Sequence, residues 1–302
     1  MWSMLIPLAL ILGTMLVPLG IVYGVRYGIK RKKRRSPLKD NFLRSPGESL
    51  REKIDALTED ILFYLAFMPV VPLAVYSIHV SQSYFGGTPE TASRTIGSIL
   101  LGLAMTLYFA VKLVKLLESR RKFRLGYEAE LATGQELNAL MLDGFRVYHD
   151  FPAEGFNIDH IVVGPCGVFA VETKGRAKPT TGNGMADAQI IYDGESLRFP
   201  KWVETKPLEQ AKSQAEWLRK WLSSATGESV GVQPVLSLPG WFVKRTSPSG
   251  IPVLNPKLFA SYVKKARGSA MVQAQINRIV HQLDQRCRNV APREYGQSRE
   301  GK

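Results

Sequence analysis

The sequence has little cysteine, with only Cys166 and Cys287 in 302 residues. Two distant cysteines make neither a disulfide framework nor a cluster with the spacing of a metal site, and such a composition is typical of a reducing compartment. Cys166 lies in a predicted hairpin turn, where we interpret it as a small turn residue. A fold held together by disulfides or by cysteine-bound zinc is therefore excluded.

Charge is absent from residues 4–24. A helix of that length crosses the roughly 30 Å hydrocarbon layer of a bilayer. A cleaved signal peptide carries its positive charges ahead of the apolar segment, whereas here no basic residue precedes Met4 and the basic run 31–35 follows it. We therefore expect a retained anchor. The alternative, a buried core helix, is disfavoured because no polar face is present.

Two further apolar stretches, residues 61–80 and 96–113, have the length of membrane spans. Three transmembrane helices are therefore expected in a membrane region over residues 1–125, with the polar loop 25–60 between the first two.

Lysine and arginine gather at residues 31–35 and 120–124, whereas residues 81–94 carry one basic residue. Basic loops stay on the cytoplasmic side of a membrane. We therefore predict a multi-pass protein of the cell (inner) membrane, with its N-terminus outside and the loop 25–60 and everything after the third span in the cytoplasm.

The formal net charge of +14 favours contact with polyanions, either nucleic acid or an anionic lipid surface. Part of that charge belongs to the two basic clusters beside the spans, which orient the helices and contact lipid headgroups. Charge by itself leaves both partners open, and the sequence does not give an oligomeric state.

The pattern of a soluble α/β domain begins at residue 126 and continues to about residue 285. Helical and strand-like stretches alternate there in an order that predicts a mixed central sheet flanked by helices. The polar residues 286–302 are predicted to be a disordered tail. The expected helices are 127–142, 206–222, 256–265 and 270–283, and the expected strands are 145–150, 156–163, 168–174, 188–192, 196–199, 232–238 and 251–254.

Acidic side chains interrupt the predicted hairpin of residues 156–163 and 168–174. If the turn at residues 164–167 closes it symmetrically, Asp159 lies opposite Glu172, with β-carbons about 4.5 to 5.5 Å apart. Two carboxylates that close repel each other unless a proton or a cation lies between them. Mg²⁺, or Mn²⁺ in its place, is the cation that suits two carboxylates and a substrate phosphate. The hairpin therefore indicates a metal site for phosphodiester hydrolysis.

Two more side chains are expected at this site. Lys174 lies two residues beyond Glu172, on the same face of the strand, where it could orient or deprotonate the attacking water or stabilise developing charge. Helical spacing places Glu130 on the face of its helix that points to the core. The alternative is an edge hairpin with a solvated ion pair. Against it, both runs are apolar on both faces, as in a central strand.

The hairpin sequence resembles a known signature. Asn-Ile-Asp-His-Ile-Val-Val-Gly-Pro, followed by Gly-Val-Phe-Ala-Val-Glu-Thr-Lys, is similar to the nuclease-related domain (NERD) family, a branch of the PD-(D/E)XK restriction-endonuclease-like superfamily. The resemblance covers residues 126–222 and implies a metal-dependent nuclease of restriction-endonuclease-like α/β fold. It implies that Asp159, Glu172 and Lys174 form the metal site.

The resemblance extends to two helices. Glu130, with Leu137 and Leu140, matches the family's first helix, although Ala129 stands where the family has Gly. Gln210 matches a glutamine that faces the site in the family's second helix, although Lys206 stands where the family has Asn.

Other candidates keep two interpretations. Arg176 and Lys178 either contact phosphates or belong to a solvated loop. Trp217 and Trp221, four residues apart, either stack on bases or pack the helix. His149 and His160 are expected in the core or packed behind the site. Gly182-Asn183-Gly184 is not a phosphate-binding loop, because no helix with the required lysine follows it.

The expected function is that of a membrane-anchored, Mg²⁺-dependent nuclease that acts on nucleic acid at the cytoplasmic face, with DNA favoured over RNA as the substrate. The alternatives are a catalytically inactive, membrane-tethered module that binds nucleic acid or protein, and a membrane scaffold.

Overall fold

The computed structural model describes residues 13–14, 16–18, 20–25, 27–28, 38–87, 89–179, 188–265 and 271–292. The chain forms two compact units. One, the helical unit, comprises Met1–Asp40, Asp55–Arg120 and Pro292–Lys302. The other, the α/β unit, comprises Asn41–Ile54 and Arg121–Ala291.

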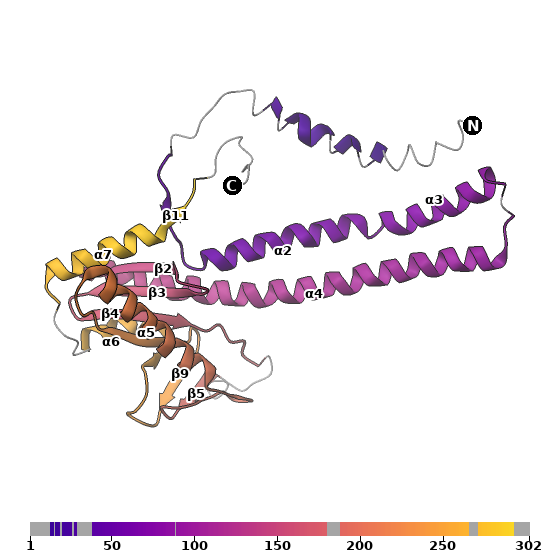
Figure 1. Ribbon diagram of the computed structural model, residues 1–302. Coiled ribbons are helices and arrows are strands. Elements are labelled where there is room, and N and C mark those ends of the chain that lie inside the picture. Colours follow the sequence, from indigo (N-terminus) through magenta and orange to yellow (C-terminus); the bar gives the residue numbers. More distant parts are fainter. Residues whose placement is uncertain are drawn as a thin grey trace. The chain divides into compact units, whose positions relative to one another are not determined.

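Long helices dominate the helical unit. Helices α2 (Glu48–Phe67) and α3 (Val70–Phe85) follow each other with Met68 and Pro69 between them, and α4 (Ala92–Asn138) is a single helix of 47 residues (Figure 1). Among the described residues, Glu48–Tyr84 and Ala92–Asp143 are the two helical stretches long and apolar enough to cross a membrane. Few side chains in the apolar part of either stretch are buried, so both are candidate membrane spans by length and composition.

Three apolar spans were expected, and the described part of the chain has two long ones. About half of the first expected span, 4–24, lies outside the described residues, and the described part contains only a short helical stretch. The expected break between residues 113 and 127 is wrong, because α4 runs through it. Residues 114–125 are charged but consist mainly of Leu, Lys, Arg and Glu, all good helix formers, so the helix has no reason to end there.

The α/β unit is built on a five-stranded mixed sheet, which confirms the expected mixed α/β architecture with flanking helices. The strand order is β10-β8-β4-β3-β2, antiparallel from β2 to β4 and parallel from β4 through β8 to β10. The strands are β2 (Arg146–Pro152), β3 (Asn157–Gly164), β4 (Gly167–Thr173), β8 (Val232–Ser237) and β10 (Val253–Leu254).

Helices cover both faces of this sheet. On one face, α5 (Lys206–Thr226) and α7 (Gln273–Cys287) pack Leu218 and Ile279 against the inner strands. On the other, the end of α4 and the short helices that follow cover Val162 and Phe169. Strand β4 is therefore buried along its whole length, and the edge-hairpin alternative is wrong. The short helices are η2 (Ala139–Asp143), η4 (Pro256–Leu258) and α6 (Phe259–Lys265).

A second, four-stranded sheet has the order β7-β6-β5-β9. Its β5–β6 hairpin was expected, and Asp193 stabilises the turn by accepting from the backbone N–H of Glu195 and Ser196. Strands β7 and β9 were not expected, because each is short and its side chains alternate too briefly to mark a strand. The strands are β5 (Gln189–Tyr192), β6 (Leu197–Arg198), β7 (Val203–Glu204) and β9 (Phe242–Arg245).

The start of the predicted tail is structured. Helix α7 continues to Cys287, and β11 (Arg288–Val290) pairs with β1 (Phe42–Leu43), which lies some 245 residues earlier in the chain. Disorder was predicted from residue 286 because the sequence there is polar, but β11 needs only backbone hydrogen bonds to pair. The remainder from residue 293 lies outside the described residues.

Candidate metal and nuclease site

Strands β3 and β4 hold two of the predicted acids. Their pairing runs from Gly164 opposite Gly167 to His160 opposite Val171, and Asp159 and Glu172 are the next residues beyond the last of these pairs. Asp159 does not reach across to Glu172, however, because its Oδ2 accepts from the backbone N–H of Thr173 at 2.7 Å.

Glu172 is almost completely buried, with 1% of its surface exposed. Its Oε1 forms an ion pair with the ammonium of Lys174. Its Oε2 is buried and has no hydrogen-bond partner in the part of the chain that the structure describes. A buried carboxylate oxygen without a partner is costly, so this atom marks a place where something else is expected to bind.

Helix α4 brings Glu130 to the same place. Gly175, just after β4, allows the close approach: a β-carbon there would lie 2.7 Å from the carbonyl oxygen of Leu125 and 3.0 Å from the β-carbon of Ala129. Glu130 is 8% exposed. Burial, followed by the charges of Asp150 and Glu172, raises its pKa from 4.5 to about 8.

The charges of neighbouring acids act on both Asp159 and Glu130. Burial raises the pKa of Asp159 well above 3.8, and the charges of Glu172 and Glu130 raise it further. The charge of Lys174 acts in the opposite direction on both Asp159 and Glu130. Burial and neighbouring carboxylates thus oppose ionisation of Asp159 and Glu130, and a proton or a cation would relieve that repulsion.

The residues present are of the types that bind a hard cation, although they do not form a complete set of ligands. No three His, Cys, Asp or Glu side chains among the described residues converge closely enough to hold an ion as they stand. The chemistry of the donors nevertheless fits, because carboxylate oxygens are the ligands that Mg²⁺ and Mn²⁺ take, and Glu172 has an unpaired oxygen to offer. The assigned roles of Glu130, Asp159 and Glu172 as ligands stay predictions.

The weaker candidates are placed less favourably. Gln210 lies on the exposed side of α5. Arg176 is already engaged, because its guanidinium forms a two-pronged ion pair with Glu204 at 2.8 Å. The ammonium of Lys178 lies over the ring of Trp241, 5.7 Å from its centroid. Trp217 and Trp221 pack against the core of α5, α7 and the sheet, as the packing interpretation expected.

Gln214 is the glutamine that α5 turns inward. It is 4% exposed, its Nε2 donates to the backbone carbonyl of Asn157 at 3.3 Å, and its Oε1 has no partner among the described residues. The sequence contained a signal for it: Gln214 lies three residues after Ala211 and four before Leu218, on the apolar face of the helix.

His149 and His160 form a buried pair with Nδ1 atoms 2.8 Å apart. Burial lowers the pKa of His149 to about 4 and that of His160 well below 6.5, so both rings are neutral at pH 7. The Nε2 of His149 lies 2.9 Å from Oδ1 of Asn138, which can only accept, so we assign the proton to Nε2. Both side chains lie in the core, where His149 contacts Asn138 of α4, as expected.

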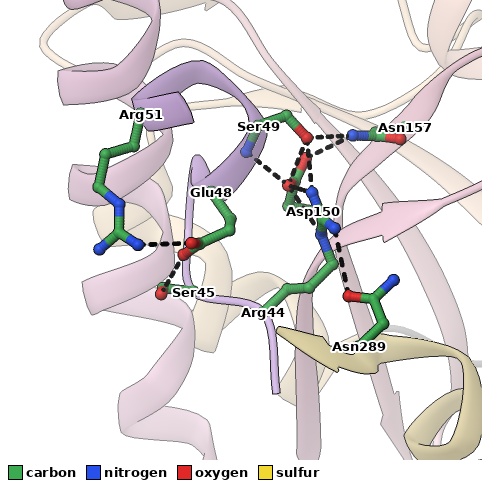
Figure 2. A network of polar contacts seen from close by, with 8 residues as sticks. All are labelled: Arg44, Ser45, Glu48, Ser49, Arg51, Asp150, Asn157 and Asn289. Carbon is green, nitrogen blue, oxygen red and sulfur yellow. Dashed lines mark hydrogen bonds and ion pairs between the residues drawn. The ribbon is translucent and has the colours of Figure 1, made fainter. Parts of the chain in front are cut away.

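A second buried acid, Asp150, lies at the centre of a hydrogen-bond network that the sequence did not predict (Figure 2). Its carboxylate accepts from Arg44, Ser49 and Asn157. Helix α2 begins at Glu48, whose carboxylate accepts from Ser45 at 2.7 Å. The S-x-x-E pattern of the helix start is therefore Ser45-Pro46-Gly47-Glu48, and Ser49, the next residue, binds Asp150.

Comparison with known proteins supports one part of this architecture. Residues 125–239 match the family of the nuclease-related domain, NERD. The matched stretch lies within the α/β unit and contains Glu130, the β3–β4 hairpin and α5. The chain has no match among curated proteins and none among solved structures.

Proposed function

We propose that the α/β unit is a divalent-metal-dependent nuclease that hydrolyses phosphodiester bonds of nucleic acid, with DNA preferred over RNA and a restriction-endonuclease-like arrangement of the site. The match of residues 125–239 to a nuclease-related domain supports the reaction class. The observation that carries the proposal is the buried, unpartnered Oε2 of Glu172 within a cluster of mutually repelling acids.

Each residue of the cluster has a proposed task. Glu130, Asp159 and Glu172 hold Mg²⁺ or Mn²⁺, which when bound supplies Lewis-acid chemistry to the phosphodiester. Lys174 already neutralises one oxygen of Glu172, and its ammonium can donate to a substrate phosphate or to an attacking water. The burial of Glu172 and Glu130 keeps bulk water away from the reacting group, which strengthens every charge interaction there.

We further propose that the two long apolar helices anchor the protein in the cell (inner) membrane, with the α/β unit at the cytoplasmic face. Their exposed apolar side chains and the basic residues at 120–124 support this proposal. The protein should stay in the membrane pellet after alkaline carbonate extraction, and protease should reach the α/β unit only in inverted vesicles. Release into the supernatant by carbonate would contradict the anchor.

The test of the nuclease uses the full-length protein in detergent. Supercoiled plasmid, single-stranded DNA and RNA are each incubated with Mg²⁺, Mn²⁺ or no metal, and nicking and release of fragments are measured. Cleavage should need the metal and disappear in Asp159→Asn and Glu172→Gln. The matched control is Glu216→Gln, an exposed acid of α5 paired with Arg219, which should cleave at the wild-type rate. Equal cleavage by all of these proteins would refute the assignment.

A second candidate is a module that binds nucleic acid without cleaving it. The ion pair between Glu172 and Lys174, together with the lack of a ready three-ligand group among the described residues, favours this alternative. It predicts DNA binding that weakens steeply as salt rises and no cleavage with any divalent metal.

A further inference from the structure

The segment Asn41–Ile54 precedes the matched domain by some 70 residues, yet it is part of the α/β unit. It is attached at its start, where β1 pairs with β11 and the backbone N–H of Arg44 donates to the carbonyl of Cys287 at 3.1 Å. The guanidinium of Arg44 also donates to Asn289 at 3.2 Å. The same segment then enters α2, the first of the two long apolar helices.

Asp150, the residue that this segment binds, interrupts β2. Its φ of 47° makes it the one non-glycine residue with positive φ among those described. In the ladder with β3, His149 pairs with His160 and Phe151 with Ile158, so Asp150 and Asp159 lie across from each other at the unpaired step. A non-glycine residue persists in this conformation only when its surroundings hold it there, and such residues cluster at functional sites.

Donors from the segment hold Asp150 in place (Figure 2). Arg44 donates to its Oδ2 from two nitrogens, at 2.9 and 2.6 Å, and Ser49 donates to it from its backbone N–H and its hydroxyl, at 2.8 and 2.6 Å. Asn157 donates to Oδ1 at 2.8 Å and also contacts the hydroxyl of Ser49. Asp150 itself is 3% exposed, so its charge depends on these donors.

Asp150 and its hydrogen-bond partners are connected to the acids of the site in two ways. Asn157 starts β3 two residues before Asp159, and its carbonyl accepts from Gln214. The charge of Asp150 acts directly on Glu130.

The turn ahead of α2 also packs on the helix that carries Glu130. A β-carbon at Gly47, where φ is +68°, would lie 2.7 Å from the ring of Tyr127 and 3.6 Å from Oε2 of Glu130. The positive charge of Lys53, one turn into α2, also acts on Glu130. The segment therefore adds Arg44, bound to Asp150, and Lys53 to the surroundings of a cluster that already contains three acids and Lys174.

We propose that Asn41–Ile54 is a working part of the site and that Arg44 is a positioning residue, which holds Asp150 so that Asp159 and Glu130 keep the geometry that binds the metal. The proposal rests on the proposed function. Groups that orient metal ligands without touching the ion typically alter affinity or turnover by about 10- to 100-fold when they are removed.

The experiment compares Arg44→Gln, Arg44→Lys and Arg278→Gln in the full-length protein. Arg278 is the matched control, because it forms an ion pair with Glu228, 50 positions away, within the same unit. Two quantities are measured: kcat and KM for plasmid cleavage at saturating Mg²⁺, and Mn²⁺ affinity by electron paramagnetic resonance. The second does not depend on turnover.

Arg44→Gln should lower kcat or weaken Mn²⁺ binding by about 10- to 100-fold, with KM for DNA unchanged, because Arg44 binds Asp150 of β2, the strand next to β3, and is not proposed to touch the substrate. Arg44→Lys keeps the charge next to Asp150 and should recover most of the loss, whereas Arg278→Gln should stay within about twofold of wild type. A general loss of folding would instead affect Arg44→Gln and Arg44→Lys alike, so the lysine variant would not recover kcat or Mn²⁺ affinity.

The outcomes separate the two proposals. If wild type cleaves DNA and Arg44→Gln behaves like Arg278→Gln, the role of Arg44 is overturned while the nuclease stands. If wild type binds Mn²⁺ without cleaving DNA, and Arg44→Gln alone weakens that binding, the role of Arg44 is supported and the proposed nuclease activity is overturned. If wild type neither cleaves nor binds Mn²⁺, both proposals are overturned.

Discussion

Asp150 and Glu172 are both buried acids of the α/β unit, but their surroundings differ completely. Asp150 accepts hydrogen bonds from Arg44, Ser49 and Asn157, so its charge is fully paired. Glu172 has one oxygen paired with Lys174 and the other without a partner in the described structure. Both charges act on Glu130, which lies between the two environments.

The contrast separates an acid that stabilises the fold from an acid that is available to bind a ligand. A buried acid saturated with donors gains nothing from a cation, because its lone pairs are occupied and its charge is compensated. An acid with an unpaired oxygen beside two other acids would release stored repulsion on binding one. Asp150 is therefore a residue that holds the fold, and Glu172 is a residue that can hold a ligand. The four predictions below test this difference, from the largest expected effect to the smallest.

The largest effect is expected on activity from Asp159→Asn. The substitution keeps the shape of the side chain and removes a charge from the cluster, so metal-dependent cleavage should fall by at least about 100-fold. Because burial and like charges already oppose ionisation of Asp159, the thermal midpoint should stay the same or rise. Asp143→Asn, which removes an exposed acid paired with Lys264, should change cleavage by less than about twofold. Cleavage by Asp159→Asn at the rate of that control would remove Asp159 from the site.

The largest loss of stability is expected from Asp150→Asn. Asparagine leaves the charge of Arg44 uncompensated and turns one acceptor into a donor facing other donors. The free energy of unfolding should fall by about 3 kcal/mol, which corresponds to a drop of about 6 to 12 °C in the thermal midpoint. Glu172→Gln should lower the midpoint far less. If the two variants melt at the same temperature, the contrast between the two acids is wrong.

The third prediction concerns pH. The pKa of Glu130 is raised from 4.5 to about 8, so the folded state holds this proton more tightly than the unfolded state. The resulting stabilisation is complete below about pH 4.5 and is lost as the pH rises toward 8, on the order of 5 kcal/mol. Without metal, wild type should therefore lose stability over this range relative to Glu130→Gln. Added Mg²⁺ should restore stability at pH 8 in wild type only.

Parallel curves of thermal midpoint against pH for wild type and Glu130→Gln, with and without Mg²⁺, would contradict this account of Glu130. The exposed Glu128 serves as the control, because its ion pair with Arg124 lies on the surface and Glu128→Gln should leave the curve unchanged.

The smallest effect separates the two glutamines of α5. Gln214→Ala removes a donor to Asn157 and should lower the free energy of unfolding by about 1 kcal/mol, with a several-fold drop in cleavage. Gln210→Ala alters an exposed position and should have no measurable effect on either quantity. The reverse ranking would show that Gln210 faces the substrate and that Gln214 only packs.

Much of the site could be predicted because strand register and helix phasing are local properties. The continuous apolar runs around Asp159 and Glu172 identified a central hairpin, and a constant register placed the two acids across from each other. Helical spacing placed Glu130 on the same face as Leu137, seven residues on, and both side chains are buried.

Contacts between distant segments could not be predicted in the same way. Nothing in the sequence near Asp150 shows that its partners are Arg44 and Ser49, more than 100 positions earlier. The pairing of β1 with β11 depends on backbone groups alone and leaves no side-chain pattern. The family motif points to Gln210 and does not mark Gln214, which shares the apolar face of the helix.

The most direct test of the central claim is a Mg²⁺ titration of plasmid cleavage by full-length wild type and Glu172→Gln, with Glu216→Gln as the exposed-acid control. Wild type and the control should show the same saturable dependence on Mg²⁺, and Glu172→Gln should show no cleavage at any concentration. Saturable cleavage by Glu172→Gln with the wild-type midpoint would show that the unpaired carboxylate oxygen is not where the metal binds.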